Sequence, residues 1–314
     1  MAVTLAEAAV LSENQLSRAI HEMFVQESPI LDRLPLMPIE GNAYAYDQEQ
    51  TLPGVAFRGV NEGYTESTGT FNQLTEKLVI LGGDSDVDRF IQQTRSNVFN
   101  QRAEQDKLKV KAMSYKFNDH FINGDVVTDP KGFDGLKKRV VGNQVIDAGT
   151  NGMPILGDGS SDTHAFFDKM DELLAACPGA DAIYASRQAR SKIISAGRRI
   201  GGVEIVKEDM TGKRVAQWQG VPILDLGDNL SGGQVLPVNE TLGTASNTSS
   251  MYAVRFGGTD GDQATTGLTN GGVQVDDLGQ LQEKPALRTR IEFYCGLALF
   301  GGKAAARLRG VIAA

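Results

Sequence analysis

Three aspartates at alternate positions, Asp84, Asp86 and Asp88, are the residues of this chain that most resemble a chemical site. They follow an apolar run and a Gly-Gly pair in the stretch LGGDSDVDRFIQQTRSN. Carboxylates this close together could bind a divalent cation or act as a phosphoryl acceptor. A calcium loop starting at Asp84 needs Gly at its sixth position and Glu at its twelfth, where the chain has Arg89 and Arg95. The aspartyl-nucleophile motif has Thr or Val where this chain has Asp88. The sequence therefore favours aspartates that complement the N-terminal dipole of a following helix.

The histidines and the glycine-rich C-terminal stretch do not complete a catalytic motif either. His21, His120 and His164 each lie in a different predicted helix, without a Ser or Cys nucleophile at a recognisable elbow. The stretch GLALFGGKAA resembles a phosphate-binding loop, but Gly302 directly follows Gly301 where that loop needs Lys, and Ala304 directly follows Lys303 where it needs Ser or Thr. We therefore predict no catalytic residue, no metal site, no cofactor and no enzymatic activity.

Composition narrows the class of protein further. The net charge is −8, which argues against a protein that reads nucleic acid through a basic face, but not against one that surrounds it. Cys177 and Cys295 lack metal-ligand spacing, so we expect small core residues in a reduced, cytoplasmic setting. No apolar run is long enough to span a membrane, and the first residues lack the basic region of a secretory signal. Glycine is abundant, with 36 residues and several Gly-Gly doublets, which predicts sharp turns or flexible joints.

The N-terminal part reads as an arm followed by a projecting hairpin. Apolar side chains at helical spacing predict a short helix over residues 12–28, which Ser28-Pro29 ends. Residues 42–81 read as two strands joined by a polar, glycine-rich segment with few apolar residues to bury. Since an isolated hairpin is marginally stable, this one predicts a partner.

A long helix is predicted over residues 90–122, because the segment lacks Gly and Pro and ends at Asn123-Gly124. The stretch 100–107 is nearly all polar, which indicates a helix that lies across a thin body and is only partly packed on it. Three intrahelical ion pairs are expected: Arg102 with Asp106, Glu104 with Lys107, and Asp106 with Lys109.

Residues 150–230 read as a compact α+β unit, and the remainder as a polar loop followed by strands. A helix is expected from Asp162 or Thr163 to Cys177, with a second, basic helix in SRQARSKIISAGRR. Residues 231–250 read as a polar loop. The predicted strands are DAIYAS, VEIVKED, VPILDL, MYAVRF, GGVQVDD and RTRIEFYCGLALF, the last buried on both faces at its apolar end.

This order of parts resembles the major capsid proteins of tailed bacteriophages, which have the Hong Kong 97-type fold. The resemblance runs from about residue 2 to residue 312. It rests on the order of the elements and on particular stretches: ESPILDRLP, LGGDSDVDRFIQQTRSN, NGD followed by GFDGLKKRV, and KPALRTRIEFYCGLALFGGKAAARLRG.

The resemblance implies an α+β fold with five parts. These are an N-terminal arm at 1–41, an extended loop at 42–81, a peripheral domain at 82–150 plus 251–314, a spine helix at 89–123 within it, and an axial domain at 151–250. It also suggests which residues meet a neighbouring subunit or act as joints. The expected contact residues are Phe57, Arg58, Tyr64, Arg102 and Glu104, and the expected flexible joints are Gly82 and Gly83.

The function implied is that of a virion shell protein. Copies of the chain would assemble in the host cytoplasm as hexamers and pentamers into an icosahedral head, and would enclose double-stranded DNA non-specifically. A separate scaffolding protein, a portal and a decoration protein would be the other partners, and no membrane would be involved. Some members of the family cross-link a lysine of the extended loop to a neighbour. Residues 42–76 contain no lysine here, the first being Lys77, so we expect no such cross-link.

Three alternatives remain at this point, one of which is a phage tail or decoration protein that would form tubes or trimers. An encapsulin-like compartment has the same fold and holds cargo protein in place of a genome. A metal-dependent hydrolase that uses the aspartates belongs to a different class, and it predicts bound metal and a small oligomer.

Overall fold

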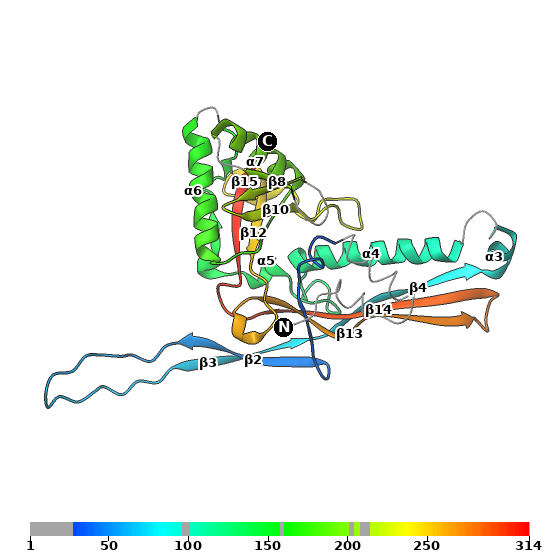
Figure 1. The fold of residues 1–314 in the computed structure, drawn as a ribbon, viewed down its shortest axis with the longest axis horizontal. Helices are drawn as coiled ribbons and strands as arrows, with labels where there is room; N and C mark the ends of the chain where they lie inside the picture. The colour runs from blue at the N-terminus through cyan, green and yellow to red at the C-terminus, as the bar shows by residue number, and fades with distance from the viewer. Residues whose placement is uncertain (1–27, 96–100, 158–159, 201–203, 208–213, 314) are drawn as a thin grey trace.

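The computed structural model describes residues 28–95, 101–157, 160–200, 204–207 and 214–313. Figure 1 shows two units set at an angle, with a narrow hairpin that projects well beyond both. The predicted N-terminal helix at 12–28 and most of the arm lie outside the described residues.

The first unit is a long four-stranded sheet with a helix along one face (Figure 1). Its strand order is β1-β13-β14-β4, with β1 parallel to β13 and the other neighbours antiparallel. The strands are β1 (Leu36–Pro38), β13 (Thr265–Gln280), β14 (Ala286–Leu299) and β4 (Val79–Asp88). The helices of this unit are α3 (Arg89–Arg95), α4 (Gln101–Asn123) and the short α5 (Leu136–Arg139).

Helix α4 is held on the sheet by an apolar stripe at three- and four-residue spacing. Val110, Met113, Phe117 and Phe121 are buried, and the Phe117 ring centroid lies 5.9 Å from that of Phe293 in β14. The helix ends as predicted, where the backbone N–H of Gly124 donates to the His120 carbonyl at 3.0 Å. The single helix predicted over 90–122 is described as two helices, α3 and α4, with residues 96–100 outside the described part.

The second unit is a nine-stranded sheet with two helices on one face. Its main order is β5-β15-β12-β7-β10-β9-β8, and β11 and β6 pair with β12 and β15. The strands are β5 (Val145–Asp147), β6 (Met153–Pro154), β7 (Ala182–Ala185), β8 (Glu204–Lys207), β9 (Arg214–Trp218), β10 (Val221–Asp225), β11 (Glu240–Leu242), β12 (Ala245–Val254) and β15 (Ala305–Ile312). The helices are α6 (Ser160–Ala176) and α7 (Arg187–Ile200), both close to their predicted positions. Single 3₁₀ turns, η1 (Gly142–Gln144) and η2 (Asp260–Asp262), lie in the connections.

The core is continuous between the two units. Phe121 at the end of α4 meets Tyr184 of β7 edge-on, with ring centroids 6.3 Å apart. Tyr252 of β12 belongs to the same buried cluster. The opposite face of the nine-stranded sheet packs on α6 and α7 through a second cluster that includes Phe166, Met170 and Ile193. The units are therefore attached to each other by buried aromatic side chains.

Two sequence predictions need correction here. Residues 231–250 contain β11 and the first half of β12, where a polar loop was predicted. Thr248, Ser249 and Ser250 are buried in that strand, and Ser250 hydrogen-bonds with Glu240 and Arg307. A polar sequence can form a buried strand here because the hydroxyls of Thr248 and Ser250 hydrogen-bond with Glu240, whereas that of Ser249 has no partner among the described residues.

The segment 251–314, predicted to belong wholly to the peripheral domain, divides between the two sheets. Strands β13 and β14 lie in the four-stranded sheet, whereas β12 and β15 lie in the nine-stranded one. The chain therefore crosses between the units twice within this segment.

Candidate assembly site

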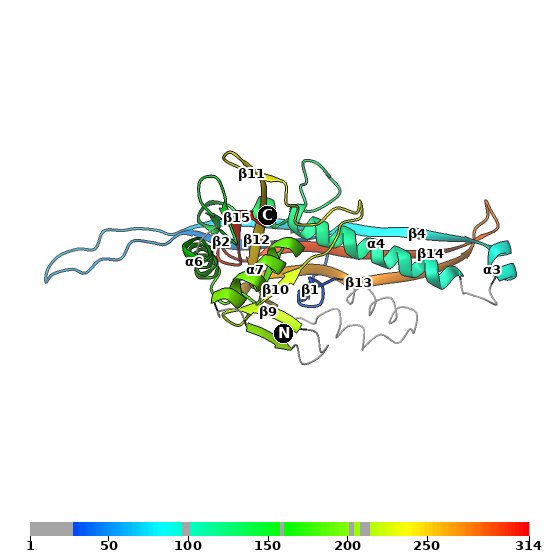
Figure 2. The ribbon, with the colours of Figure 1, turned by 90° about the horizontal axis from the view of Figure 1, so that it is seen from above.

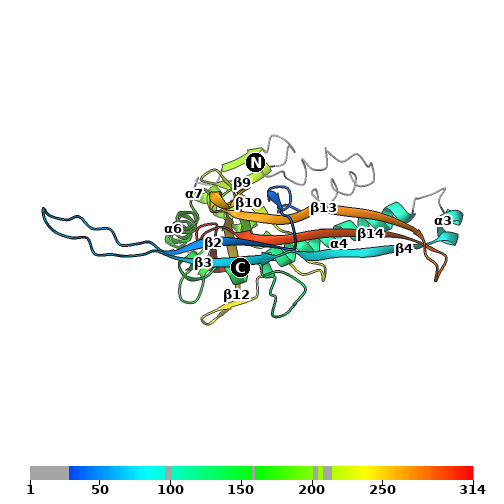
Figure 3. The same ribbon diagram turned by 90° about the horizontal axis from the view of Figure 1, so that it is seen from below.

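The hairpin is a two-stranded sheet of its own, formed by β2 (Ala43–Thr51) and β3 (Thr70–Lys77). Its register runs from Ala43 opposite Lys77 to Thr51 opposite Thr70. Beyond these pairs residues 52–69 continue outward as an extended loop, far from both units in all three ribbon views (Figures 1, 2 and 3). The predicted projecting hairpin is confirmed, although it ends at Lys77, and residues 79–81 already belong to β4.

The outer part of the hairpin exposes large apolar side chains. The Phe57 side chain is fully exposed, and the exposed fractions of Val55 and Val60 are 97% and 93%. Leu52, Tyr64 and Phe71 are also mostly exposed. Several exposed large apolar side chains on one segment point to a protein contact, since the monomer has nothing with which to cover them.

Polar contacts shape the tip without burying those side chains. The Arg58 guanidinium lies 5.3 Å from the Tyr64 ring centroid and donates to the Glu62 carbonyl at 3.0 Å. The backbone N–H of Gly59 donates to the Glu62 carboxylate at 2.8 Å. The structure thus brings together three of the five predicted contact residues, Phe57, Arg58 and Tyr64, at one end of the hairpin.

The base of the hairpin is fastened to the body. Tyr46 packs edge-on against Phe300, with ring centroids 4.9 Å apart, and its hydroxyl donates to the Leu299 carbonyl at 3.1 Å. Burial raises the pKa of Tyr46 to about 12. On β3, Glu76 accepts a bidentate ion pair from Arg139 of α5, with Nη2 to Oε2 at 2.6 Å. A fixed base and a free tip suit a segment that reaches a neighbouring molecule.

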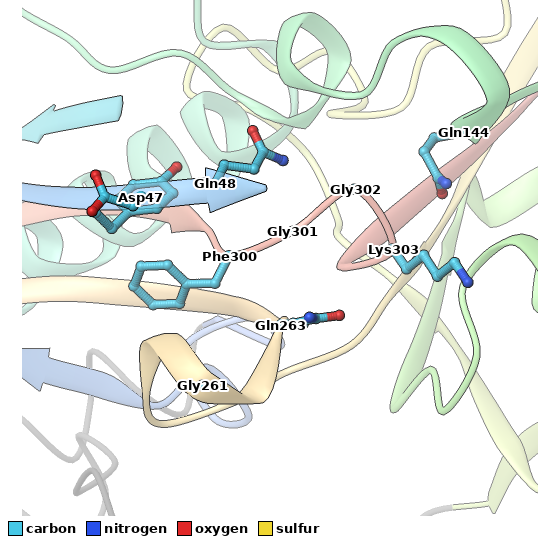
Figure 4. A pocket seen from close by; sticks show the side chains of 10 residues that line it. Asp47, Gln48, Gln144, Gly261, Gln263, Phe300, Gly301, Gly302 and Lys303 are labelled. Atoms are coloured by element: carbon cyan, nitrogen blue, oxygen red, sulfur yellow. The ribbon is translucent and has the colours of Figure 1, made fainter. Parts of the chain in front are cut away.

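A crevice of about 590 Å³ opens beside this base (Figure 4). Its walls are β2, through Asp47 and Gln48, and the connection between β14 and β15, through Gly301 and Gly302. Its lining is mixed: Tyr46 and Phe300 contribute aromatic surface, and Gln144, Gln263 and Lys303 contribute polar groups. This lining holds no nucleophile with an adjacent base, and we assign it no chemistry.

The aspartates Asp84 and Asp86 form ion pairs across two strands. Asp84 accepts from Arg290 at 2.8 and 3.0 Å, and Asp86 accepts from Arg288 at 2.6 and 2.8 Å. Lys284 lies 2.6 Å from Asp86. Hydrogen bonds from these arginines hold the pKa of both carboxyls below their usual range. The two carboxylates therefore stabilise the pairing of β4 with β14.

The helix-capping role predicted for all three aspartates is correct for one of them. Asp88 accepts the backbone N–H of Phe90 at 2.7 Å, at the start of α3. For Asp84 and Asp86 the prediction is wrong, because alternate spacing placed them on one face of a strand. The matching alternation of Arg288 and Arg290 was the sequence signal that could have indicated this ladder.

Helix α4 is tied to the sheet by polar contacts that sequence reasoning missed. Arg102 donates to Thr289 at 2.9 Å and lies 2.5 Å from Asp277 of β13. Asp106 is buried beneath the helix, and this burial raises its pKa, opposed by hydrogen bonds from Ser85 and Thr289. The predicted polar surface of residues 100–107 is thus partly an interior contact.

The two predicted contact residues on α4, Arg102 and Glu104, make different contacts. Glu104 faces outward and accepts from Lys107 at 3.0 Å, which confirms that predicted pair. Arg102 donates a hydrogen bond to Thr289 and forms an ion pair with Asp277 of its own chain, where the sequence predicted a pair with Asp106. Glu104 is the more exposed of the two, and a contact of either residue with a neighbour stays a prediction.

The predicted joints Gly82 and Gly83 lie inside β4, opposite Glu292 and Ile291 of β14. A Cβ on Gly82 would lie 2.5 Å from the Ile291 carbonyl oxygen, so this glycine permits close strand packing. Both residues are paired in a sheet ladder in this structure, and their role as joints stays a prediction.

Glycine pairs do occur where the chain crosses between the two sheets. Gly257-Gly258 lies in the connection from β12 to β13, and Gly301-Gly302 in the connection from β14 to β15. Gly301 has φ +102°, a conformation that favours glycine. These two connections are better placed than Gly82-Gly83 to allow small changes in the angle between the units.

The histidine and cysteine residues have structural environments. Half-buried His120 lies 3.3 Å from Asp129 through Nε2, and burial lowers its pKa. Cys177 and Cys295 are buried, as predicted, and burial raises the pKa of Cys177 to about 12. Within the described ranges no group of three or more His, Cys, Asp or Glu residues is arranged to hold a metal ion. The helices in the described part of the chain include none that is long and apolar enough to cross a membrane.

Comparison with known proteins agrees with this geometry. Residues 12–163 match the family described as major capsid protein GP7. The SrpI encapsulin of Synechococcus elongatus aligns at TM-score 0.66 and 19% identity, covering 100% of this chain and 97% of its own. Mycobacterium phage Bobi aligns at TM-score 0.60 and 15% identity, covering 91% and 90%. The capsid of a native GTA particle aligns at 0.63 and 14%, also covering 91% and 90%. A search of curated proteins finds no match.

The chain has the Hong Kong 97-type fold. The expected peripheral domain, axial domain and extended loop would correspond to the four-stranded unit with α4, the nine-stranded unit and the projecting hairpin, and these assignments stay predictions. The apolar side chains of the hairpin extend away from the core of their own chain, so another molecule must cover them if they are to be buried.

Proposed function

We propose that this protein builds the icosahedral head of a tailed phage, assembled as hexamers and pentamers around double-stranded DNA. The observation that carries the proposal is the hairpin, whose base is fastened and whose apolar tip is exposed. The match of residues 12–163 to the GP7 capsid family supports a phage head over other shells of the same fold.

In an assembled shell, a neighbouring subunit would bury the apolar side chains that the hairpin tip exposes. Phe57 and Tyr64 are large aromatic side chains of the kind that dominate protein interfaces. When a neighbouring copy covers them, truncation of one should cost roughly 2 kcal/mol or more per contact. Residues 42–76 contain no lysine, so we infer that these contacts are non-covalent.

The protein acts as a structural component without catalytic activity, assembles in the host cytoplasm and becomes part of the virion. Scaffolding, portal and decoration proteins are its proposed partners, and the DNA is held without sequence recognition. The net charge of −8 fits a wall that encloses DNA without binding it tightly.

An encapsulin-like compartment is the second candidate. It is favoured by the alignment to the SrpI encapsulin, which covers 100% of this chain at TM-score 0.66. Such a shell would enclose protein cargo. The metal-dependent hydrolase is not proposed further, because Asp84 and Asp86 are engaged by arginines.

Electron microscopy of particles purified from the native source, with nuclease treatment before extraction, tests the proposal. Closed shells containing nuclease-protected double-stranded DNA are expected. Shells that contain a single cargo protein and no DNA would establish the encapsulin alternative. A monomer that never forms capsomers at high concentration would refute both.

A further inference from the structure

Helix α7 has a basic outward face. Its fourteen residues include five cations and no acidic residue. Ala189, Ile193 and Ala196 are buried against the nine-stranded sheet, so the charged side chains lie on the other faces of the helix. The sequence suggested a basic helix here, and the tertiary structure shows which side of the fold it covers.

These cations are only partly neutralised by their own chain. Arg187 lies 3.1 Å from Asp225 and 3.6 Å from Asp228. Arg190, Lys192, Arg198 and Arg199 form no ion pair with any described residue, and the buried Nε of Arg190 has no hydrogen-bond partner among them. A charge surplus of this kind favours an acidic partner.

Helix α6, on the same face of the sheet, has an acidic outward stripe. Asp168, Asp171 and Glu172 are exposed. Glu172 accepts from Lys169 at 2.5 Å, and Asp171 accepts the Trp218 indole N–H at 2.7 Å, which leaves Asp168 without an ion pair to the described residues. The stripe therefore retains net negative charge.

The two helices cover different strands of the sheet. Helix α6 packs over β15, β5 and β6 and also reaches Trp218 of β9 through Phe167 and Asp171, whereas α7 packs over β10. Figure 1 shows α6 and α7 as separate helices of this unit. In a ring each subunit offers two different surfaces, one to each neighbour. Opposite charges on the two helices are suited to such a head-to-tail contact.

We propose that the basic face of α7 in one subunit contacts the acidic stripe of α6 in the next subunit of the same ring. This inference rests on the proposed ring assembly and names the surfaces that close it. A second copy is favoured over nucleic acid because the complementary acidic surface is present on every subunit at equal concentration. The contact should guide association and weaken as salt increases.

Charge reversal with rescue tests the contact. Arg198→Glu with Arg199→Glu, and separately Asp168→Arg with Glu172→Arg, should each lower capsomer formation about tenfold or more in low salt. The four changes combined should restore it to within about threefold of the wild type. Native mass spectrometry measures capsomers, far-UV circular dichroism confirms folding, and Lys131→Glu, an exposed reversal away from both helices, is the control.

Absence of an effect from either reversal, or absence of rescue, would overturn the proposal. Normal capsomer yield with less DNA in particles of the α7 variant would also overturn it, and would assign the face to nucleic acid. Failure of the wild type to form rings would instead refute the proposed assembly itself.

Discussion

Replacement of Gly82 by alanine gives a direct test of the role that the structure assigns to this residue. The new Cβ would lie 2.5 Å from the Ile291 carbonyl oxygen and 3.1 Å from Glu292 Cα. Carbon–oxygen contacts normally lie at about 3.3–3.6 Å, so β4 and β14 must separate by close to 1 Å. The neighbouring atoms are backbone atoms of a ladder and cannot rotate away.

The expected magnitude follows from two opposing effects. Overpacking of this kind costs about 1–3 kcal/mol. Because alanine has less conformational freedom than glycine in the unfolded chain, the substitution also stabilises the folded state by about 0.4–1 kcal/mol. Gly82→Ala should therefore destabilise the folded chain by about 1–2 kcal/mol, which urea unfolding of the unassembled protein measures as a lower midpoint at unchanged slope.

Gly83→Ala is the matched control. Its Cβ would meet only the end of the Lys109 side chain, at 3.3 Å, which can move at little cost. We expect stability within about 0.5 kcal/mol of the wild type. Equal stability of the two variants, together with a defect in shell expansion shared by both, would refute the packing role and restore the interpretation of these glycines as joints.

Three further predictions concern the hairpin and the arginine–aspartate ladder. Phe57→Ser should leave the urea midpoint unchanged, because the side chain is already exposed, but should sharply lower the yield of closed particles seen by electron microscopy. Arg139→Gln should loosen the hairpin base and raise its rate of proteolytic cleavage several-fold, and an unchanged rate would show that the Glu76 pair does not fasten it. Asp86→Asn should destabilise the unassembled protein by about 1 kcal/mol at neutral pH, since the pair with Arg288 is partly exposed and screened. The pKa of Asp86 is lowered on folding, so its stabilisation is complete above the unfolded value of 3.8 and is lost as pH falls toward the lower folded value. The wild type should therefore lose more stability than the Asn variant in acid titrations of the urea midpoint.

Local patterns in the sequence were sufficient for the elements that depend on neighbours in the chain. The absence of Gly and Pro and the Asn123-Gly124 stop predicted a helix over residues 90–122, which contains most of α4, and helical spacing and capping placed α6 and α7. The polar, glycine-rich segment between two alternating runs predicted the projecting hairpin, and its lack of apolar residues to bury predicted a partner. These features follow from helical period, strand alternation and capping, which act over a few residues.

The tertiary structure decided which distant residues meet. By their spacing alone, Asp84 and Asp86 resemble a metal loop or a helix cap. In the structure they pair across β4 and β14 with Arg290 and Arg288, which lie about two hundred positions later in the chain. The sequence suggested that Gly82 is a joint, whereas in the structure the Ile291 carbonyl oxygen lies close to where a Cβ would be. Strands β14 and β15 are neighbours in the chain yet lie in different sheets, because Gly301-Gly302 turns the backbone between them. Paired strands can be separated by any number of residues in the chain. The sequence alone therefore does not indicate which residues of two strands lie opposite each other, and only the fold decides their roles.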